Sequence, residues 1–588
     1  MGSSTRRSVC LLVLIMILGG YLRFHDIEDR GPSFFDDGIY TLEGKWIYTF
    51  SKALVSGLKR KIEEVRLRQN LYSFKEEAER IGASIEGEPP VWGRPGFSLL
   101  TGICMGLLGP RIYATNLVSA VFGTLSILGI FLLGRAMFNE RVGLLAALLL
   151  AVSGYHLVYS VTGLSDGTAM CFALFAFYLY YKSKAREGEG RGGYLFAVLA
   201  GLGCGMAFAV HDRMLYVFLV LLLNEGIDFL QGRGQRKKRL KKTAVLGSAF
   251  LFTIGAFEFP YYLGMIVLRH FGKPLPFRTY FEELFTHHIF NFFDFFAVSL
   301  VELKKYPEFR EAGSRLWNFV TYPYLFMQFD GVVFCLLFLA GSVAAFLQRR
   351  YEDRLLWVWL LVPFFLFSTG LSTNVRYALV FMPAAFLIAA RSLWFFEERI
   401  PWMTRMRRRN QRILVVAFLL IVVVSGLYAS REIREMRCSY SEPIAFLKAH
   451  GSKHVSLQYP VTKAYLGKEN VKEPPNTLEE LYDDYQEGYR YFLVDFRKFF
   501  MKPPFGDSPQ GKIIEEIEST TEPVFSYLHP CYTSPCYLFE INVFFRLTRK
   551  IVREAHEMGV DQIHIYDLED YFTKKGVGEG SVEGPAQG

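Results

Sequence analysis

Residues 112–134 read IYATNLVSAVFGTLSILGIFLLG and are followed by RAMFNER at residues 135–141. The first stretch has no charged side chain over a length that lets a helix cross the hydrocarbon core of a bilayer. The second stretch is short and basic, as cytoplasmic loops of membrane proteins are. Apolar blocks of this kind alternate with short charged loops along most of the chain. The pattern predicts an α-helical polytopic membrane protein.

The composition agrees with this fold class. Apolar residues make up 51% of the 588 residues, and aromatic residues make up 16%. A soluble chain of this length would distribute its apolar residues over several smaller cores. The net charge of +9 could suggest a nucleic-acid partner, but the basic residues gather in the short loops. We therefore expect membrane lipids as partners and no nucleic acid.

The apolar blocks predict about eleven transmembrane helices. The first block, Val9–Leu18, lies behind Arg6 and Arg7 and also fits a secretory signal peptide. Gly19 and Gly20 follow it where an A-x-A-like cleavage site would stand, which favours a retained helix. The other expected helices cover residues 112–134, 142–158, 167–182, 193–210, 214–231, 243–268, 323–347, 354–370, 377–394 and 413–430.

The loop charges orient these helices. With the N-terminus in the cytoplasm, every inside loop is basic, as the positive-inside rule requires. We interpret the most basic one, RGQRKKRLKK at residues 233–242, as a cytoplasmic loop near anionic lipid. The unusual polar residues then fall on the opposite face. They are Asp36, Asp37, Arg94, Ser160, Asp166, His211, Asp212, Arg213, His287, His288, Arg376 and Tyr377.

This one-sided distribution bears on the class of protein. A transporter places its polar groups near the bilayer midplane, on broken helices. Polar residues collected at one surface favour an enzyme that works at the extracytoplasmic or lumenal face. A transporter or flippase of lipid-linked sugars stays the alternative. A non-catalytic receptor or scaffold would leave the Asp and Arg cluster without a purpose.

The chain is expected to divide at residue 430. Residues 1–430 form the transmembrane domain, in which 24–110 is an extracytoplasmic loop with interfacial helices near 54–65 and 97–108. Residues 431–573 form an extracytoplasmic α/β domain, and 574–588 a disordered tail. The elements expected in the α/β domain are helix Ser441–Lys448, strand Val455–Gln458, a helix from Thr477 to Gln486 with a Thr477/Glu480 capping box, strand Tyr491–Asp495, helix Val543–Met558 and strand Gln562–Tyr566.

Cysteine usage is compatible with this division. Five cysteines lie in apolar stretches, where they fill the core. Cys438, Cys531 and Cys536 belong to the outer domain, and Cys531 could be bridged to Cys536 because that side can be oxidising. No Cys/His spacing indicates a structural zinc site.

Four motifs follow one another along the outer face. Asp36-Asp37 with Tyr40 comes after the first helix, Arg94-Pro95 opens an interfacial helix, Ser160 precedes Asp166, and Arg376-Tyr377 precedes Pro383. This order resembles that of the GT-C membrane glycosyltransferases, in the branch of the protein O-mannosyltransferases and lipid A aminoarabinose transferase. The resemblance covers roughly residues 8–395. The family's basic-Pro-Pro-Leu turn stands here as Arg94-Pro95-Gly96-Phe97.

The resemblance implies a GT-C fold and a donor sugar linked to polyprenyl or dolichyl phosphate. It implies transfer, with inversion, to an acceptor hydroxyl on a protein, a glycan or a lipid. The location would be the cell membrane, or the endoplasmic reticulum membrane in a eukaryote. Such a reaction needs a base for the acceptor hydroxyl. It also needs cations that absorb the charge of the phosphate leaving group.

These needs assign the candidate residues. Asp36 is the expected base and Asp37 supports it, unless the pair only caps an interfacial helix. Arg94, Arg213 and Arg376 are candidates for the donor phosphate, unless they reach to lipid headgroups. Asp166 either orients substrate, binds a divalent cation or caps the following helix. Tyr40, Tyr377, His287 and His288 complete the predicted substrate contacts, and the His pair has a structural alternative.

Overall fold

The computed structural model describes two compact units, which are treated separately below. The helical unit comprises residues 1–27, 89–109 and 114–435, and the α/β unit comprises residues 28–88, 110–113 and 436–588. The described residues are 3–67, 84–87, 94–186, 191–231, 236–269, 316–369, 375–399, 408–431, 440–451, 453–495, 497–501, 508–529 and 562–576.

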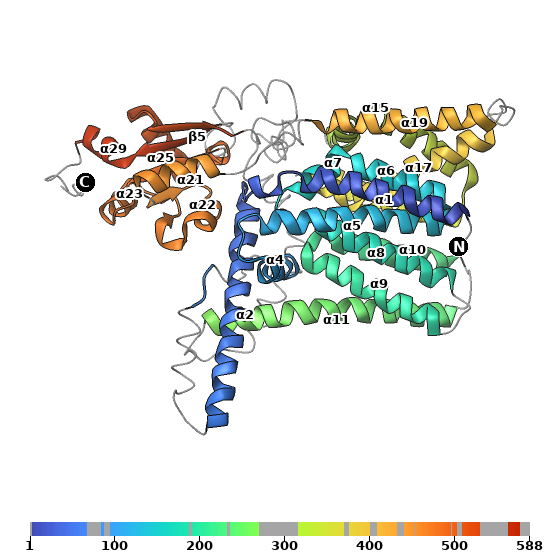
Figure 1. Cartoon of the computed structure of the whole chain (residues 1–588), viewed down its shortest axis with the longest axis horizontal. Helices are drawn as coiled ribbons and strands as arrows, with labels where there is room; N and C mark the ends of the chain where they lie inside the picture. The colour runs from blue at the N-terminus through green and yellow to red at the C-terminus, as the bar shows by residue number, and fades with distance from the viewer. Residues whose placement is uncertain are drawn as a thin grey trace. The chain divides into compact units, whose positions relative to one another are not determined.

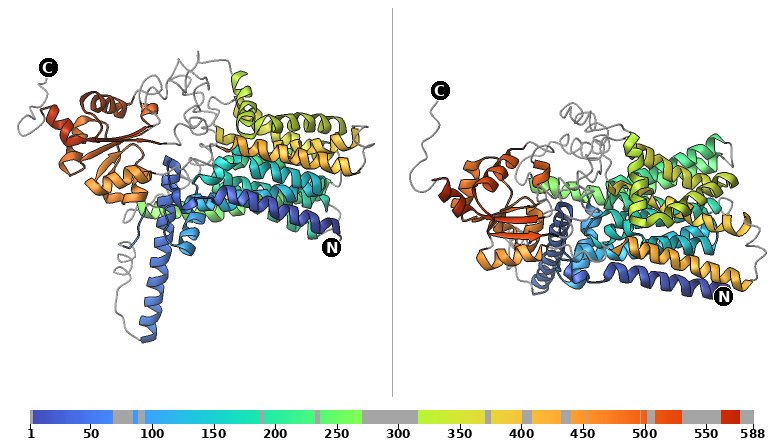
Figure 2. Two further views of the ribbon diagram at one scale, coloured as in Figure 1. Left: turned by 45° about the horizontal axis from the view of Figure 1, so that its top comes forward. Right: turned by 90° about the horizontal axis from the view of Figure 1, so that it is seen from above.

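Long helices packed side by side make up the helical unit (Figures 1 and 2). Helix α8 packs against α5 and α9, α9 packs against α11, and α15 packs against α17. The helices are α1 (Ser3–Phe24), α4 (Pro95–Leu108), α5 (Ala114–Met137), α6 (Glu140–Val152), α7 (Gly154–Val161), α8 (Asp166–Ala185), α9 (Arg191–Val210), α10 (Leu215–Leu230), α11 (Arg236–Arg269), α15 (Leu316–Gln348), α16 (Tyr351–Thr369), α17 (Met382–Arg399) and α19 (Arg408–Ala429).

Several of these helices can cross a membrane. Among the described residues, five helices are long and apolar enough, and six if the bent pair α6/α7 counts as one span. Helix α4 is a shorter apolar helix, in line with its interpretation as interfacial. The protein is therefore a multi-pass membrane protein, while the number of eleven spans stays a prediction.

Two expected helices differ from the structure. The helix predicted over 142–158 is broken, because Ser153 is extended and α6 meets α7 at a bend of 60°. The Ser153 hydroxyl accepts a hydrogen bond from the His156 N–H (3.1 Å) and so caps α7. The helix predicted over 377–394 begins only at Met382, since the Pro383 ring has no N–H and suits the first turn of a helix rather than its interior.

A buried arginine stabilises the break between α6 and α7. The guanidinium of Arg23 donates to the carbonyl oxygens of Ala151 (3.1 Å) and Leu150 (3.2 Å), and it contacts Nδ1 of His156 at 2.7 Å. The last carbonyls of a helix have no partner within that helix. Arg23 supplies donors to two of them inside the apolar unit, so that α6 can end there without leaving these oxygens bare.

The α/β unit contains a five-stranded sheet of order β2-β1-β3-β5-β4. Strand β1 pairs in parallel with β2 and β3, and β5 pairs antiparallel with β3 and β4. Strand residues Phe492 and Val494 pack with Ile514 and Tyr571 in its core. The elements are α2 (Phe35–Leu67), α21 (Ser441–His450), β1 (His454–Ser456), α22 (Tyr459–Leu466), β2 (Val471–Lys472), α23 (Leu478–Gln486), β3 (Tyr491–Val494), α24 (Lys498–Met501), α25 (Pro509–Thr520), β4 (Phe525–Leu528), β5 (Gln562–Asp567) and α29 (Leu568–Lys574).

Most of the elements expected here are present. Thr477 caps α23 by accepting from the Glu480 N–H, and the Glu480 carboxylate accepts from the Asn476 N–H. The strand predicted over Val455–Gln458 is shorter, because Gln458 instead precedes the first turn of α22. The helix predicted over Val543–Met558 lies outside the described residues.

Helix α2 belongs to the α/β unit, although the sequence suggested a loop of the transmembrane domain. Gly38 on α2 lies so close to α22 that an added methyl group would stand 2.6 Å from the Val461 nitrogen. The Phe35 ring meets the Tyr459 ring edge-on at 5.3 Å. Further along α2 the apolar side chains Leu54, Leu58 and Ile62 are exposed, as expected of a helix that lies on a membrane.

Candidate functional site

The first polar cluster lies where α8 begins and α9 ends in the helical unit. Asp166 is the first residue of α8, and His211 directly follows α9. The Asp166 Oδ1 atom is 3.0 Å from His211 Nε2, and His211 Nδ1 is 2.8 Å from Asp212 Oδ1. Asp166 and His211 are only 3% and 1% exposed. One imidazole ring therefore links two carboxylates that come from different helices.

Electrostatics keep Asp166 ionised. Burial alone would raise the pKa of its carboxyl group. The charge of His211 and its hydrogen bond to Asp166 lower that pKa, and the charges of Arg376 and Arg94 lower it further. The pKa of Asp166 is thus held below its usual value. Its Oδ2 atom makes no hydrogen bond within the described residues. The carboxylate is an anion among cations, with one oxygen still available to accept a hydrogen bond.

Three arginines predicted as phosphate contacts gather at this cluster. The charges of Arg94 and Arg376 attract the Asp166 carboxylate, and those of Arg94 and Arg213 attract the Asp212 carboxylate. The guanidinium of Arg213 also lies 4.0 Å from the centroid of the Tyr377 ring, a cation–π contact. Three guanidinium groups against two carboxylates leave an excess of positive charge. Such a cluster suits an anionic group of a substrate.

Gly96 explains how Arg94 reaches the cluster. A methyl group added to Gly96 would lie 2.8 Å from the carbonyl carbon of Ala209 and 2.9 Å from the Val210 nitrogen. The first turn of α4 therefore packs directly on the backbone at the end of α9. His211 follows this backbone, and Arg94 precedes that turn. Glycine at the place of the second proline in the Arg94-Pro95-Gly96-Phe97 turn permits this approach.

The acidic pair predicted as catalytic lies at the start of α2 in the α/β unit. The Asp37 carboxylate accepts hydrogen bonds from the backbone N–H groups of Ser33 (3.1 Å) and Phe34 (2.8 Å), and it is 1% exposed. Asp37 thus caps the start of α2, as in a capping box. Asp36 is half-buried beside it. The two carboxylates differ in environment, and only Asp37 is fixed by the turn before the helix.

The remaining predicted residues have different surroundings. Tyr40 is buried within the α/β unit. The Ser160 hydroxyl donates to the His156 carbonyl inside α7 (2.7 Å). His287 and His288 lie outside the described residues, as do Cys438, Cys531 and Cys536, while the other five cysteines are free thiols. In the described part of the chain, no group of three or more His, Cys, Asp or Glu side chains is placed to hold a metal ion.

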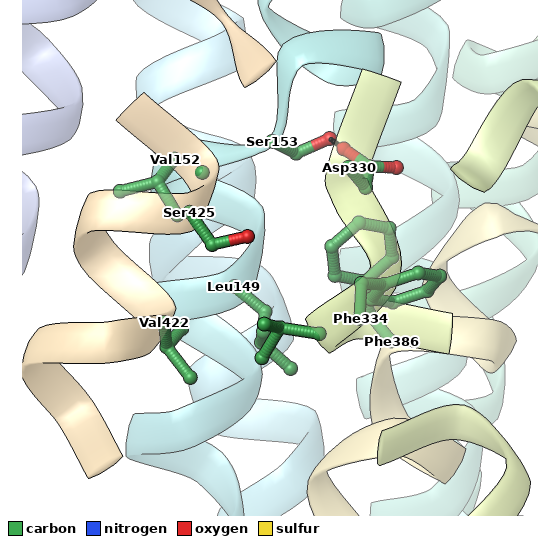
Figure 3. Close-up of a pocket in the computed structure, with 10 residues that line it drawn as sticks. Leu149, Val152, Ser153, Asp330, Phe334, Phe386, Val422 and Ser425 are labelled. Atoms are coloured by element: carbon green, nitrogen blue, oxygen red, sulfur yellow. Dashed lines mark hydrogen bonds between the residues drawn. The ribbon is translucent and has the colours of Figure 1, made fainter. Parts of the chain in front are cut away.

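Sequence reasoning missed a buried carboxylate inside the helical unit. Ser153 lies at the break between α6 and α7, and its hydroxyl donates to Asp330 Oδ1 on α15 at 2.6 Å (Figure 3). Asp330 lies next to Gly331, where α15 is kinked. A single acidic residue within an otherwise apolar segment is the signal that could have identified it.

Comparison with known proteins finds a family that part of the chain resembles. Residues 89–257 match the family model described as dolichyl-phosphate-mannose-protein mannosyltransferase, and this segment contains Arg94, Asp166, His211 and Arg213. The match covers less than half of the chain. Within these residues the chain is similar to that family of glycosyltransferases.

Solved structures share the fold of this chain. The archaeal oligosaccharyltransferase AglB from Archaeoglobus fulgidus, in complex with an inhibitory peptide and a dolichol-phosphate, has a TM-score of 0.54 and 12% identity over 91% of this chain and 74% of AglB. ArnT from Cupriavidus metallidurans in the apo state has a TM-score of 0.51 and 11% identity, over 84% of this chain and 94% of ArnT. Its form bound to undecaprenyl phosphate has a TM-score of 0.50 and 12% identity, over 86% and 96%. Curated protein sequences gave no match.

The resemblance seen in the sequence is thus confirmed for the GT-C fold and the enzyme class. Of the candidate residues, Asp166, Arg94, Arg213, Arg376 and Tyr377 come together in the GT-C helical unit, while their roles stay predictions. The sequence pointed to the His-Asp-Arg run at 211–213 but assigned a role only to its arginine. The central position of His211 was missed because its partner Asp166 lies on another helix.

Proposed function

We propose that this glycosyltransferase moves one sugar from a polyprenyl-phosphate-linked donor to an acceptor hydroxyl at the extracytoplasmic or lumenal membrane face, with inversion at the sugar carbon. The observation that carries the proposal is the cluster of Arg94, Arg213 and Arg376 around the Asp166–His211 pair. Part of this cluster lies within the segment matched by the mannosyltransferase family model.

The cationic cluster would bind the phosphate of the donor. A phosphate leaving group needs no protonated acid, because cations can take up the charge that develops on it. Guanidinium groups suit this task through paired, charge-assisted hydrogen bonds. Asp166 and His211 would position the arginines, since an ionised carboxylate that is held by a histidine is a poor proton donor. The cluster thereby favours departure of the lipid phosphate.

Asp36 would act on the acceptor as the general base. Its neighbour Asp37 has both oxygens engaged by backbone N–H groups, which occupy the lone pairs that would accept a proton. Asp36, which is half-buried, is therefore the better candidate of the two. A positioned base typically contributes about 10²–10⁴-fold to the rate. Dependence on a divalent cation belongs to the same proposal and is tested by adding a chelator.

The test uses the purified full chain in detergent. The protein is incubated with a panel of polyprenyl-phosphate sugars, and release of the free lipid phosphate is measured by mass spectrometry. We expect release from at least one donor, and we expect Asp36→Asn to abolish it. The matched control is Glu63→Gln, an exposed carboxylate on the same helix α2. Turnover retained by folded Asp36→Asn would overturn the role of Asp36.

One observation favours the transporter alternative. Helices α6/α7 and α15 are both broken, and the buried Asp330 lies at the junction, as in transporters that bind ions at broken helices. A transporter would leave the donor intact in detergent, where no transmembrane gradient exists. Release of lipid phosphate under these conditions separates the two functions.

A further inference from the structure

Two interrupted helices meet at one buried carboxylate in the helical unit. α6 ends at Val152 and α7 begins at Gly154, while α15 leaves helical geometry at Gly331, with φ of 81°. Asp330 precedes that kink, and it is 6% exposed. An ionised side chain inside an apolar helix is costly, and such residues commonly serve a function. Asp330 plays no part in the sugar transfer proposed above.

The two oxygens of Asp330 differ in their surroundings. Oδ1 accepts from the Ser153 hydroxyl at 2.6 Å and lies 3.5 Å from the Tyr155 nitrogen. This oxygen therefore faces the N-terminal end of α7, where partial positive charge favours an anion. Oδ2 has no hydrogen-bond partner within the described residues. Half of the carboxylate is satisfied, and the other half still lacks a compensating group.

A pocket beside Asp330 is lined by residues that carry further oxygen atoms (Figure 3). Ser153, Ser425 and Val152 line it together with apolar side chains. Ser425 lies close to the kink, since a methyl group on Gly331 would be 3.0 Å from its Oγ. The carbonyl oxygen of Val152 belongs to the last turn of α6, where carbonyl groups lack partners within the helix. The other lining residues are Leu149, Val333, Phe334, Phe386, Val422 and Gly426.

We propose that this pocket binds one monovalent metal cation of the size of Na⁺. The donor atoms are all oxygens, and a single carboxylate neutralises a single positive charge. A Ca²⁺ site would draw on six to eight oxygens, as a rule with several carboxylates. In broken membrane helices, the N-terminal end of one half faces an anion while the freed carbonyls of the other half coordinate Na⁺. Here α7 supplies the first end and α6 the second.

The experiment measures binding directly and is independent of the transferase assay. The purified full chain is incubated with ²²Na⁺ at constant ionic strength, with choline as the replacement cation, and bound label is counted. We expect saturable binding that unlabelled Na⁺ displaces and choline does not. Asp330→Asn should abolish this binding, because the amide removes the charge while its oxygen can still accept from Ser153. Ser126→Ala is the control, since that hydroxyl donates to Phe122 within its own helix and does not line the pocket.

Three results would overturn the proposal. Absence of saturable ²²Na⁺ binding by folded wild-type protein would show that no Na⁺ site exists. Full binding by folded Asp330→Asn would place the ion elsewhere. Thermal stability that depends on pH through Asp330, without any dependence on Na⁺, would assign the position to a proton. If Asp330→Asn fails to fold, Ser425→Ala replaces it, and we expect about tenfold weaker binding from the loss of one ligand.

Discussion

The Oδ1 atom of Asp166 lies 3.0 Å from Nε2 of His211, which joins the first residue of α8 to the residue that follows α9. Since His211 also faces Asp212 at 2.8 Å, one ring fixes two carboxylates. His211 Nδ1 also accepts a hydrogen bond from the Arg213 backbone N–H at 3.3 Å. His211 thereby fixes the position of the Asp166 carboxylate, with which the guanidinium groups of Arg94 and Arg376 interact.

Replacing the linking histidine tests this arrangement. His211→Ala should lower kcat/KM for the donor by roughly 10–100-fold, mainly through a higher KM, because Asp166 and Asp212 lose the group that positions them. The assay is the release of lipid phosphate from the active donor. His450→Ala, an exposed histidine of α21, should behave like the wild type. An unchanged KM in folded His211→Ala would contradict the positioning role.

Substitutions at the cation–π pair of Arg213 and Tyr377 test whether donor binding needs only the charge of Arg213 or also its contact with the ring. Arg213→Lys keeps the charge but loses the planar group that stacks on the ring, so we expect a higher KM for the donor by about tenfold. Tyr377→Phe keeps the ring and should change KM little. Donor titrations of both variants measure these values. A wild-type KM for Arg213→Lys together with a raised KM for Tyr377→Phe would mean that the Tyr377 hydroxyl, and not the stacked ring, carries the interaction.

The close contact between α4 and α9 depends on Gly96, which has no side chain. Gly96→Ala places a methyl group 2.8 Å from the Ala209 backbone, which cannot move without shifting α9, and we expect a loss of about 1–3 kcal/mol in stability. The first turn of α4 should shift with Arg94, and donor turnover should fall as well. Thermal unfolding and the release assay measure the two effects.

Gly106→Ala is the matched control on the same helix. Nothing lies within 4 Å of a methyl group added to Gly106, and alanine favours a helix by about 1 kcal/mol over glycine. We expect equal or higher stability and unchanged turnover. Equal behaviour of the two variants would mean that α4 and α9 do not depend on this close approach.

A buried carboxyl in the α/β unit predicts a dependence of stability on pH. Burial raises the pKa of Asp495 to about 6, although its side chain accepts hydrogen bonds from the Tyr440 hydroxyl and the Arg497 N–H. A pKa raised in the folded state means that the contribution of this group to stability is complete below pH about 4. It is lost as the pH rises through about 6.

The variant Asp495→Asn checks that sign. We expect it to unfold at a higher temperature than the wild type at pH 7.5, by an amount equivalent to on the order of 2 kcal/mol. At pH 4 we expect the two proteins to be nearly equal. Thermal unfolding of the full chain at both pH values provides the measurement. A destabilisation at pH 7.5 would show that the ionised form is the one that the fold favours.

Much of the fold followed from local patterns. The apolar block at 112–134 became α5, and the Thr477/Glu480 pair caps α23, because hydropathy and capping act over a few neighbouring residues. The break at Ser153 was missed, since hydropathy continues across it. Arg23 stabilises the break by donating to the Ala151 carbonyl, and these two residues lie 128 positions apart along the chain. No local pattern reports a donor so far away.

The candidate site divides in the same way. The order of acidic and basic motifs indicated the enzyme class and predicted Arg94, Asp166, Arg213 and Arg376 as substrate contacts. It did not show that Asp37 caps α2, which depends on how the turn at Ser33 and Phe34 closes.

The sequence by itself determined that this is a multi-pass membrane protein with the motif order of a GT-C glycosyltransferase, because apolar length and motif order are properties of a linear chain. Only the tertiary structure decided that His211 links Asp166 to Asp212 and that Asp330 lies between two broken helices. Each of these contacts joins residues from different helices. The physical reason is that the energy of a buried charge is set by its neighbours in space.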